Sequence, residues 1–201
     1  MADAPHVYDA IVLAGGRSSR MGDVDKLQAV VDGATLLTHA LAAVADARRV
    51  VVVAPEGTAG LPAGVARVQE EPPFSGPAAA MGAGLAALGE HADAAEHVVV
   101  VAADVPRVGD VVDALLSGLA AHPSHDGVVA LGVDGRRQPL LAAHRVAPLR
   151  AALAGHEPLA HLSATRVTSS LDLVEIDVAD VADDVDTPAD LHRLSQERHD
   201  G

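Results

Sequence analysis

The sequence predicts an α/β fold, in which a mainly parallel sheet of about six or seven strands lies between layers of helices on both faces. Short apolar runs rich in valine alternate along the chain with longer segments of helical spacing. The apolar runs are nearly continuous, without the polar alternation of a half-exposed strand, which indicates strands buried on both faces of a parallel sheet. A length of 201 residues suits one domain with a sizeable core.

The individual elements follow from the same patterns. Five apolar runs are expected to be strands, and three segments with apolar residues at helical spacing are expected to be helices. The first strand should end near Ala14, and Thr35 is a suitable N-cap for the first helix because its hydroxyl can accept a backbone N–H. The expected strands are residues 8–14, 48–54, 96–103, 127–133 and 138–144, and the expected helices are residues 35–47, 76–90 and 108–122.

The chain shows no internal repeat or linker, so we expect one domain over residues 1–195 and a frayed tail over residues 196–201. Toward the end of that domain, Thr187 is expected to cap a last helix that starts at Pro188. Residues 54–64 are rich in Gly and Pro, which predicts a surface loop.

Composition excludes several classes of protein. Tyr8 and Phe74 are the only aromatic residues, so the core must be aliphatic, and the absence of cysteine excludes disulfides and thiolate metal sites. A formal net charge of −14 argues against broad binding to nucleic acid or to anionic membranes. The amino-terminal residues lack the basic start and apolar run of a signal peptide, and no apolar stretch approaches the roughly 20 residues of a membrane span. We therefore expect a cytoplasmic protein.

The strongest functional signal is the segment around the end of the first strand, residues 11–26, which reads IVLAGGRSSRMGDVDK. It gathers Arg17, Arg20 and Lys26 in one glycine-rich loop of an acidic chain, and Lys26 is the only lysine of the sequence. The glycine pair alone would indicate an ordinary turn between a strand and a helix. Backbone N–H groups of a glycine turn together with three cations instead indicate a phosphate-binding loop. The loop is not a Walker A motif, because no Gly-Lys-Ser/Thr follows.

Two acidic segments contain candidate metal ligands. Asp104 follows a run of four valines, and because an ionised carboxylate inside a buried strand would be costly, we expect it at the open end of that strand. There it either caps the next helix or binds Mg²⁺, since hard cations take carboxylate oxygens. Asp184 and Asp186 have strand-like spacing. They either form a solvated acidic turn, or Asp186 pairs with Asp104 across the sheet and completes a metal site.

Residues 70–77, which read EEPPFSGP, form a proline-rich segment before an expected helix. The segment is either an ordinary rigid loop or one in which Glu70 or Glu71 accepts hydrogen bonds from a base or a ribose. A second glycine pattern, GAGLAA at residues 82–87, fits the dinucleotide-binding motif but lies inside an alanine-rich helix rather than directly after a strand. We interpret its small residues as allowing the helix to pack closely on the sheet.

Together these segments resemble the molybdenum cofactor guanylyltransferases, within the wider nucleotidyltransferase superfamily. LAGGRSSRMGDVDKL resembles the family signature, which runs roughly L-A-G-G, a few residues, R-M-G, then D-K-x-L. EEPPFSGP, ADVP, RRQPL and DVDTPADL resemble its later landmarks and stand in the same order, so the similarity covers about residues 8–195. The resemblance implies a single Rossmann-like nucleotidyltransferase domain.

The resemblance also implies roles for individual residues. The start of the glycine-rich loop would lie along the nucleotide, and Lys26, Arg20 and Asp104 would be the catalytic residues. Glu71, or Glu70 in its place, would help to recognise the base or ribose in a pocket shaped by the Gly-Pro pair. The implied nucleotide-binding residues are Leu13, Ala14, Gly15, Gly16, Arg17, Arg20, Lys26, Glu71, Gly76, Pro77 and Asp104, and the implied Mg²⁺ ligands are Asp104 and Asp186.

The implied reaction transfers a nucleoside monophosphate to a phosphorylated small-molecule acceptor such as molybdopterin and releases pyrophosphate. GTP is the favoured substrate and Mg²⁺ the implied cofactor, while nucleic acid and membranes are not expected as partners; the protein is expected to be a monomer or a weak homo-oligomer. The family often has Asp in place of Glu71, and its guanylyltransferases often have Asn in place of Asp186. These departures leave open a cytidylyl- or sugar-phosphate nucleotidyltransferase, and a non-catalytic nucleotide-binding protein is the more distant alternative.

Overall fold

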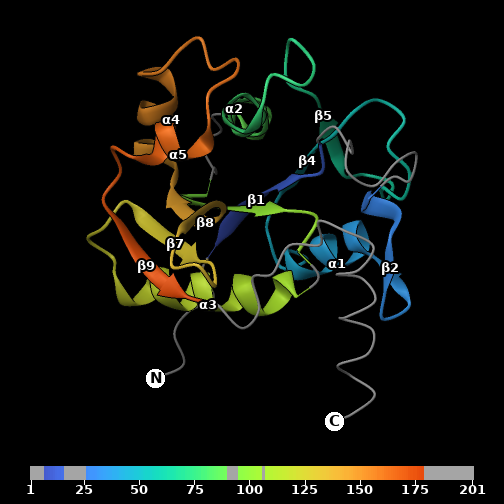
Figure 1. The fold of residues 1–201 in the computed structure, drawn as a ribbon, viewed down its shortest axis with the longest axis horizontal. Helices are drawn as coiled ribbons and strands as arrows, with labels where there is room; N and C mark the ends of the chain where they lie inside the picture. The colour runs from blue at the N-terminus through green and yellow to red at the C-terminus, as the bar shows by residue number, and fades with distance from the viewer. Residues whose placement is uncertain (1–6, 16–25, 90–94, 106, 179–201) are drawn as a thin grey trace.

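The computed structural model describes residues 7–15, 26–89, 95–105 and 107–178. Its centre is a seven-stranded sheet with the order β5-β4-β1-β6-β8-β7-β9 (Figure 1). Four neighbouring pairs are parallel, and β8 runs antiparallel to β6 and β7. The predicted fold class is therefore confirmed. The strands of this sheet are β1 (Tyr8–Leu13), β4 (Val50–Val53), β5 (Ala66–Val68), β6 (His97–Ala102), β7 (Gly127–Leu131), β8 (Arg137–Arg145) and β9 (Leu173–Asp177).

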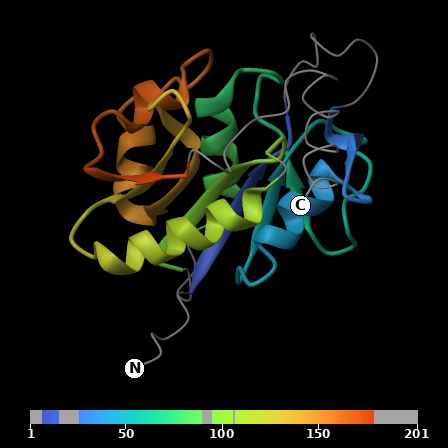
Figure 2. The ribbon, with the colours of Figure 1, turned by 60° about the horizontal axis from the view of Figure 1, so that its bottom comes forward.

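Helices cover both faces of the sheet, as the sequence predicts. In Figure 1 the sheet lies between one layer formed by α2, α4 and α5 and another formed by α1 and α3, and Figure 2 shows α1 and α3 side by side in front of the strands. A short helix and a two-stranded hairpin precede α1. These elements are η1 (Lys26–Gln28), β2 (Val30–Val31), β3 (Ala34–Thr35), α1 (Leu36–Ala43), α2 (Pro77–Leu88), α3 (Val108–Ala121), α4 (Val146–Ala154) and α5 (Ala164–Thr168).

The core is aliphatic and has two halves, one on each face of the sheet. Successive side chains of a strand point to opposite faces, so Val12 of β1 packs with α1 and α3 while Ile11 packs with α2 and α4. Both side chains are 0% exposed. Because β1 and its neighbours are buried on both faces, their sequences are continuous apolar runs, which is the pattern that predicted a parallel sheet.

The predicted elements agree with the structure where the local signals are strong. The first strand ends at Leu13, next to the predicted Ala14, and Thr35 is the N-cap of α1 because its side chain accepts a hydrogen bond from the Thr38 amide at 3.1 Å. Residues 54–64 form a loop of consecutive turns, as predicted. The sequence pattern predicts no element for β5, β9, α4 or α5. The predicted helix cap at Thr187 and Pro188, and the tail at residues 196–201, lie outside the described residues.

Gly84 shows how closely α2 approaches the sheet. A Cβ atom at this position would lie 2.6 Å from Cγ2 of Ile11 and 3.1 Å from Cγ2 of Val53, which are both buried. A second glycine of the same motif, Gly82, faces outward to Leu159. The small residues of this segment therefore serve packing, as interpreted from the sequence, and Gly84 is required by the sheet rather than by a ligand.

We expect Gly84→Ala to destabilise the protein by about 1–3 kcal/mol, the usual cost of overpacking a core. Gly109 of α3 is the matched control, because no atom lies within 4 Å of the position that a Cβ would take there. Gly109→Ala should be neutral or stabilise by up to about 1 kcal/mol, since it lowers the entropy of the unfolded chain. Urea unfolding of both variants measures the difference, and equal changes would contradict the close packing of α2.

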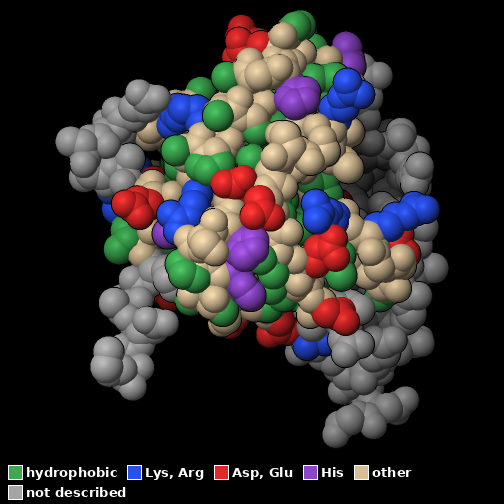
Figure 3. Space-filling model, turned by 90° about the vertical axis from the view of Figure 1, so that its left-hand side faces the viewer, with side chains coloured by type: hydrophobic (Ala, Val, Ile, Leu, Met, Phe, Trp, Pro, Cys, Tyr) green, Lys and Arg blue, Asp and Glu red, His purple; other side chains and the backbone are tan. Residues whose placement is uncertain are grey.

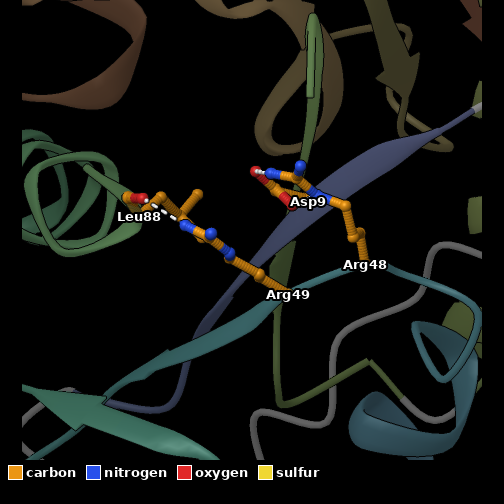
Figure 4. Close-up of polar contacts among 4 residues, drawn as sticks. All are labelled: Asp9, Arg48, Arg49 and Leu88. Atoms are coloured by element: carbon orange, nitrogen blue, oxygen red, sulfur yellow. Dashed lines mark hydrogen bonds and ion pairs between the residues drawn. The ribbon is translucent and has the colours of Figure 1, made fainter. Parts of the chain in front are cut away.

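One ion pair and one hydrogen bond fix the strand ends that lie away from the predicted site. Asp9 in β1 is 3% exposed, and both of its carboxylate oxygens accept hydrogen bonds from the Arg48 guanidinium at 3.2 Å (Figure 4). The next residue, Arg49, donates to the carbonyl oxygen of Leu88 at the end of α2, at 3.3 Å. A buried carboxylate needs such a partner. These contacts join the amino end of β1 to the segment before β4 and to the end of α2.

His144 is a buried titratable residue in the centre of the sheet. It lies on β8 opposite Val98 and Gly127, is 0% exposed, and neither ring nitrogen has a hydrogen-bond partner among the described residues. Burial lowers the pKa of His144 from 6.5 to about 4, and the negative charge of Asp126 opposes this shift more weakly. The folded protein therefore holds the imidazole neutral, while the unfolded chain binds a proton at a higher pH.

The protein should consequently lose stability as the pH falls from about 6.5 toward 4, because the unfolded state binds more protons over that range. A shift of this size corresponds to about 3 kcal/mol at the acid end of the window. We expect His144→Leu to flatten this pH dependence in urea titrations at a series of pH values. His122→Gln, at the end of α3, should keep the slope of the unmodified protein. The same slope in the His144→Leu variant would contradict this assignment.

The surface shows no single basic region on the face over α4, α5 and β9. Figure 3 shows acidic and basic side chains interspersed there with hydrophobic ones. This arrangement agrees with the acidic composition of the chain, since broad binding of polyanions needs a concentrated positive patch. Within the part of the chain that the structure describes, every helix is too short or too polar to cross a bilayer.

Candidate functional site

The carboxyl ends of three adjacent parallel strands meet at one edge of the sheet. Leu13 is in register with Val53 of β4 on one side and with Ala102 of β6 on the other. The pairing continues past the strands, because the Ala14 amide donates to the Val53 carbonyl at 2.9 Å and the Ala103 amide donates to the Leu13 carbonyl at 3.0 Å. Ligands of open parallel sheets bind at such an edge. The start of the glycine-rich loop and Asp104 therefore emerge side by side.

Leu13, Ala14 and Gly15, at the start of the glycine-rich loop, differ in which of their atoms a ligand could contact. The side chains of Leu13 and Ala14 are buried in the two halves of the core, at 8% and 1% exposure, so only their backbone could contact a nucleotide. Gly15 follows the last of the strand hydrogen bonds and is exposed. The predicted contacts at Gly16, Arg17 and Arg20 lie outside the described residues.

Lys26 begins the short helix η1, although the position of its side chain lies outside the described part of the structure. The two residues that follow it are anchored. Leu27 packs against the core below α1, and Gln28 donates from Nε2 to the Ala59 carbonyl at 3.2 Å. Ala59 belongs to the loop that leaves β4, so these contacts hold η1 near the carboxyl edge of the sheet.

Asp104 is half-buried in a turn directly after β6, between Ala103 at 1% and Val105 at 0% exposure. The alternative prediction that Asp104 caps the next helix is wrong. Helix α3 begins only at Val108, and its N-cap is Arg107, whose side chain makes no capping hydrogen bond. A carboxylate held at the open edge of a sheet without a capping role fits a charged ligand such as Mg²⁺. Its predicted partner, Asp186, lies outside the described residues.

The loop before α2 is tightly fixed at the same edge. It leaves the carboxyl end of β5, whose last carbonyl, that of Val68, accepts from the Ala54 amide at 2.9 Å. Ser75 is 1% exposed, its hydroxyl donates to the Pro72 carbonyl, and its own carbonyl accepts from the His161 amide at 2.6 Å. The loop is therefore held both by its own atoms and by the segment between α4 and α5.

The predicted Gly-Pro pair starts α2. Gly76 is the N-cap with φ of 97°, in the left-handed region that favours glycine, and Pro77 is the first helical residue. The first amide of the helix, that of Ala78, donates to the Leu162 carbonyl at 3.4 Å, so the start of α2 is bonded to the segment between α4 and α5. Gly76 and Pro77 therefore set the shape of the loop where α2 starts. Their contact with a nucleotide remains a prediction.

The two glutamates of this loop have different surroundings. Glu70 accepts a hydrogen bond from the Phe74 amide at 3.0 Å, so its carboxylate closes the loop on itself. Glu71 is exposed and lines a pocket of about 720 Å³ on the outer side of α2, which also includes Glu157. Recognition of the base or ribose by Glu71 therefore remains a prediction, and the structure adds a role for Glu70 in fixing the loop.

Two features of the edge carry no signal in the sequence. The first is the segment between α4 and α5, whose His161 amide and Leu162 carbonyl bond to Ser75 and to the Ala78 amide. The second is the direction of β8, which is antiparallel to β6 and so brings its first residues, Arg137 and Gln138, to the edge where β6 ends. Arg137 is paired with Glu175 of β9 at 2.8 Å. Among the described residues, no three His, Asp or Glu side chains form a metal cluster.

The fold and this edge define the class of protein: an α/β domain that presents a glycine-rich first loop and a strand-end aspartate at the carboxyl ends of parallel strands. The chain belongs to the MobA-like NTP transferase domain family, whose family model matches residues 10–171. The matched region includes most of β1, all of α2, and Asp104.

Individual proteins are similar to the chain in part of their sequence or in their fold. The chain is 35% identical over 128 residues to a molybdenum cofactor guanylyltransferase of Bradyrhizobium sp. (strain ORS 278), and that match spans 62% of this chain and 59% of the relative. The fold is similar to that of molybdopterin-guanine dinucleotide biosynthesis protein A from Archaeoglobus fulgidus, with a TM-score of 0.67, 18% identity, and coverage of 96% of this chain and 100% of that one.

Cytidylyltransferases share the fold as well. The inositol-1-phosphate CTP transferase from T. maritima matches with a TM-score of 0.70 and 14% identity, covering 98% of each chain. The 2-C-methyl-D-erythritol 4-phosphate cytidylyltransferase from Thermus thermophilus matches with a TM-score of 0.60 and 20% identity, covering 94% of this chain and 98% of that one. At these identities the likeness concerns the fold, and it does not decide which base is bound.

Proposed function

We propose that this chain is a Mg²⁺-dependent nucleotidyltransferase that transfers GMP from GTP to a phosphorylated acceptor, with molybdopterin as the acceptor. The observation that carries the proposal is the position of Asp104 beside the first loop at the carboxyl edge, in a chain of the MobA-like family. The guanylyltransferase from Bradyrhizobium, at 35% identity, supports GTP and the molybdenum cofactor as the substrates.

In the proposed reaction an ionised phosphate oxygen of the acceptor attacks the α-phosphorus of GTP. The bond from that phosphorus to the oxygen bridging to the β-phosphate breaks, and pyrophosphate leaves. A phosphate nucleophile is already deprotonated at neutral pH, so no general base is needed. The chain must instead position two polyanions and offset the negative charge that builds up on the phosphates.

The first loop and the start of α2 are suited to this task. Backbone amides of the glycine turn, together with Arg20 and Lys26, would bind the phosphates and stabilise the transition state. The dipole of α2 adds partial positive charge where this helix starts, after the loop that leaves β5. A local cationic site resolves the conflict between a net charge of −14 and a triphosphate substrate.

The acidic residues of the site fit Mg²⁺. Asp104 is half-buried at the strand end, has no helix-capping role, and stands beside the loop that would carry the phosphates. We assign Asp104 and Asp186 as the residues that hold the ion, which prefers a few carboxylates together with substrate phosphates. When bound, Mg²⁺ would neutralise phosphate oxygens of the triphosphate.

Transfer of CMP is the second candidate function. Asp186 and Glu71 depart from the pattern of the guanylyltransferases, and enzymes that act on CTP share this fold. Base choice depends on hydrogen bonds that the wrong base leaves unpaired. Release of pyrophosphate from GTP, CTP, ATP and UTP, each with and without molybdopterin, tests both candidates. We expect release from GTP that depends on the acceptor. Release from CTP instead would establish the second candidate, and no release from any triphosphate would contradict both.

A further inference from the structure

Phe74 has the largest apolar side chain of the loop before α2, and this side chain is unusually exposed. The chain has two aromatic residues, of which Tyr8 is 4% exposed in the core, whereas Phe74 is 44% exposed. An exposed apolar side chain is not informative by itself. The backbone at Phe74 provides the second observation, because its φ is 63°.

A positive φ is rarely adopted by a bulky residue. Two other non-glycine residues in the described part of the chain share it, Asp32 and His161, and both residue types are enriched at positive φ. Phenylalanine is not enriched there, so Asn or Gly would suit the turn better. Strained residues that persist tend to lie where the side chain has a function.

The turn that contains Phe74 is held in place by its neighbours. The Phe74 amide donates to the Glu70 carboxylate at 3.0 Å, and the next residue, Ser75, is buried and bonded through its hydroxyl and its carbonyl. Gly76 follows with φ of 97°. These contacts are made by the backbone of Phe74 and by its neighbours, and they fix the turn. The turn places a partly exposed aromatic side chain at the surface, with 44% of its area accessible.

The loop also lies at the edge proposed for the nucleotide. It leaves β5, which is paired with β4, which in turn is paired with β1. The phosphates would lie between β1 and β6, where the glycine-rich loop and Asp104 emerge. A nucleotide that extended from there across β4 would bring its base to the loop of Phe74. An aromatic ring can stack on any base, and such a stack contributes substantially to binding.

We propose that Phe74 is a substrate-binding residue that stacks on the nucleobase of the bound triphosphate. This inference rests on the proposed nucleotidyltransferase function. The ring would supply affinity for a planar base, while hydrogen bonds from elsewhere in the pocket would distinguish one base from another. Strain at this position is then the consequence of a requirement for an aromatic ring in a turn that suits Asn.

Binding of GTP and of inorganic triphosphate, which lacks a base, tests the proposal by calorimetry in the presence of Mg²⁺. Phe74→Asn should weaken GTP binding by ~10- to 100-fold, as expected for the loss of one stack. It should leave the affinity for inorganic triphosphate unchanged, and its melting temperature should equal or exceed that of the unmodified protein because Asn suits the backbone. Phe74→Tyr keeps the ring and should bind GTP normally.

The outcomes are distinguishable. Failure of the unmodified protein to bind any nucleoside triphosphate would contradict the proposed function itself. If that protein binds GTP, then normal GTP binding by Phe74→Asn, or an equal loss for both ligands, would overturn the stacking role. Phe74→Gly guards against a folding defect. If both Phe74→Asn and Phe74→Gly melted at lower temperature than the unmodified protein, Phe74 would be a structural anchor and the inference would be wrong.

Discussion

Replacing Asp104 by Asn is expected to lower nucleotidyl transfer by more than ~10³-fold, at or above the upper end of what single preorganised charges contribute. The substitution keeps the shape of the side chain and removes the negative charge that a hard cation requires. Asp104 lies in a turn after β6, outside the buried core of the sheet, and does not cap α3. We therefore expect the melting temperature to change little. Initial rates of pyrophosphate release and a thermal melt measure the two effects.

Asp110 provides a matched control, because it carries the same charge in the first turn of α3 and is exposed. Its partner is Arg107, at 2.8 Å, and an exposed pair of this kind contributes little to stability. Asp110→Asn should turn over at the normal rate. Asp104→Asn should also lose the part of GTP affinity that depends on Mg²⁺. Near-normal turnover of the Asp104→Asn variant would show that the metal assignment is wrong.

Replacing Lys26 by Ala is expected to lower turnover by at least ~10²- to 10³-fold, the loss seen when one preorganised charge is removed. Lys26 is the only lysine beside thirteen arginines, so composition alone favours arginine at this position. We infer that the site requires a compact ammonium, which contacts phosphate oxygens as a point charge where a planar guanidinium would be crowded. Lys26→Arg should therefore be defective although its charge is kept.

The melting temperature of both Lys26 variants should stay close to that of the unmodified protein, since Leu27 and Gln28 carry the contacts that anchor η1. Arg166→Ala on α5 is the control for the loss of one positive charge, because Arg166 is exposed on a helix of the opposite half of the molecule. It should turn over normally. Wild-type turnover in Lys26→Arg would favour a solvated lysine at the mouth of the loop, and near-normal activity in Lys26→Ala would establish that alternative.

The central part of the fold is predictable from the sequence because burial imposes a strong pattern. The valine runs of β4 and β6 are buried on both faces, so every residue must be apolar, and a continuous run bounded by polar residues marks each strand. Thr35 marks the start of α1 because its hydroxyl satisfies a free amide of the first turn. These signals are local, and local signals can be read without knowing the neighbours.

The edge strands of the sheet could not be predicted, because burial imposes only a weak pattern on their sequences. β5 has three residues, two of them exposed, and β9 alternates buried and exposed residues over a short length, so neither differs much from a loop in sequence. Their pairing is decided by β4 and β7, which is tertiary information. In the same way, nothing in the sequence of β8 shows that it runs antiparallel to β6, and that direction alone brings Arg137 to the carboxyl edge.

The candidate site was predictable as a set of segments and less so as individual contacts. Placing Asp104 and the glycine-rich loop at one edge follows from the parallel order of β1 and β6, which the valine runs indicate. Excluding Asp104 as the cap of the next helix required knowing that α3 begins at Val108 and that its N-cap is Arg107, and the metal-binding role of Asp104 is still a prediction. Separating Glu70 from Glu71 required the turn around Phe74, because adjacent residues with the same side chain differ only in direction.

The fate of the α-phosphate of GTP tests the central claim most directly. We would incubate the protein with Mg²⁺, molybdopterin and GTP that carries a radioactive α-phosphate, and in parallel with GTP labelled on the γ-phosphate. We expect the α-label to move to the acceptor as a dinucleotide and the γ-label to leave as pyrophosphate, and we expect Asp104→Asn to do neither. Retention of the α-label in GTP, or release of the γ-label as single phosphate, would contradict nucleotidyl transfer at this edge of the sheet.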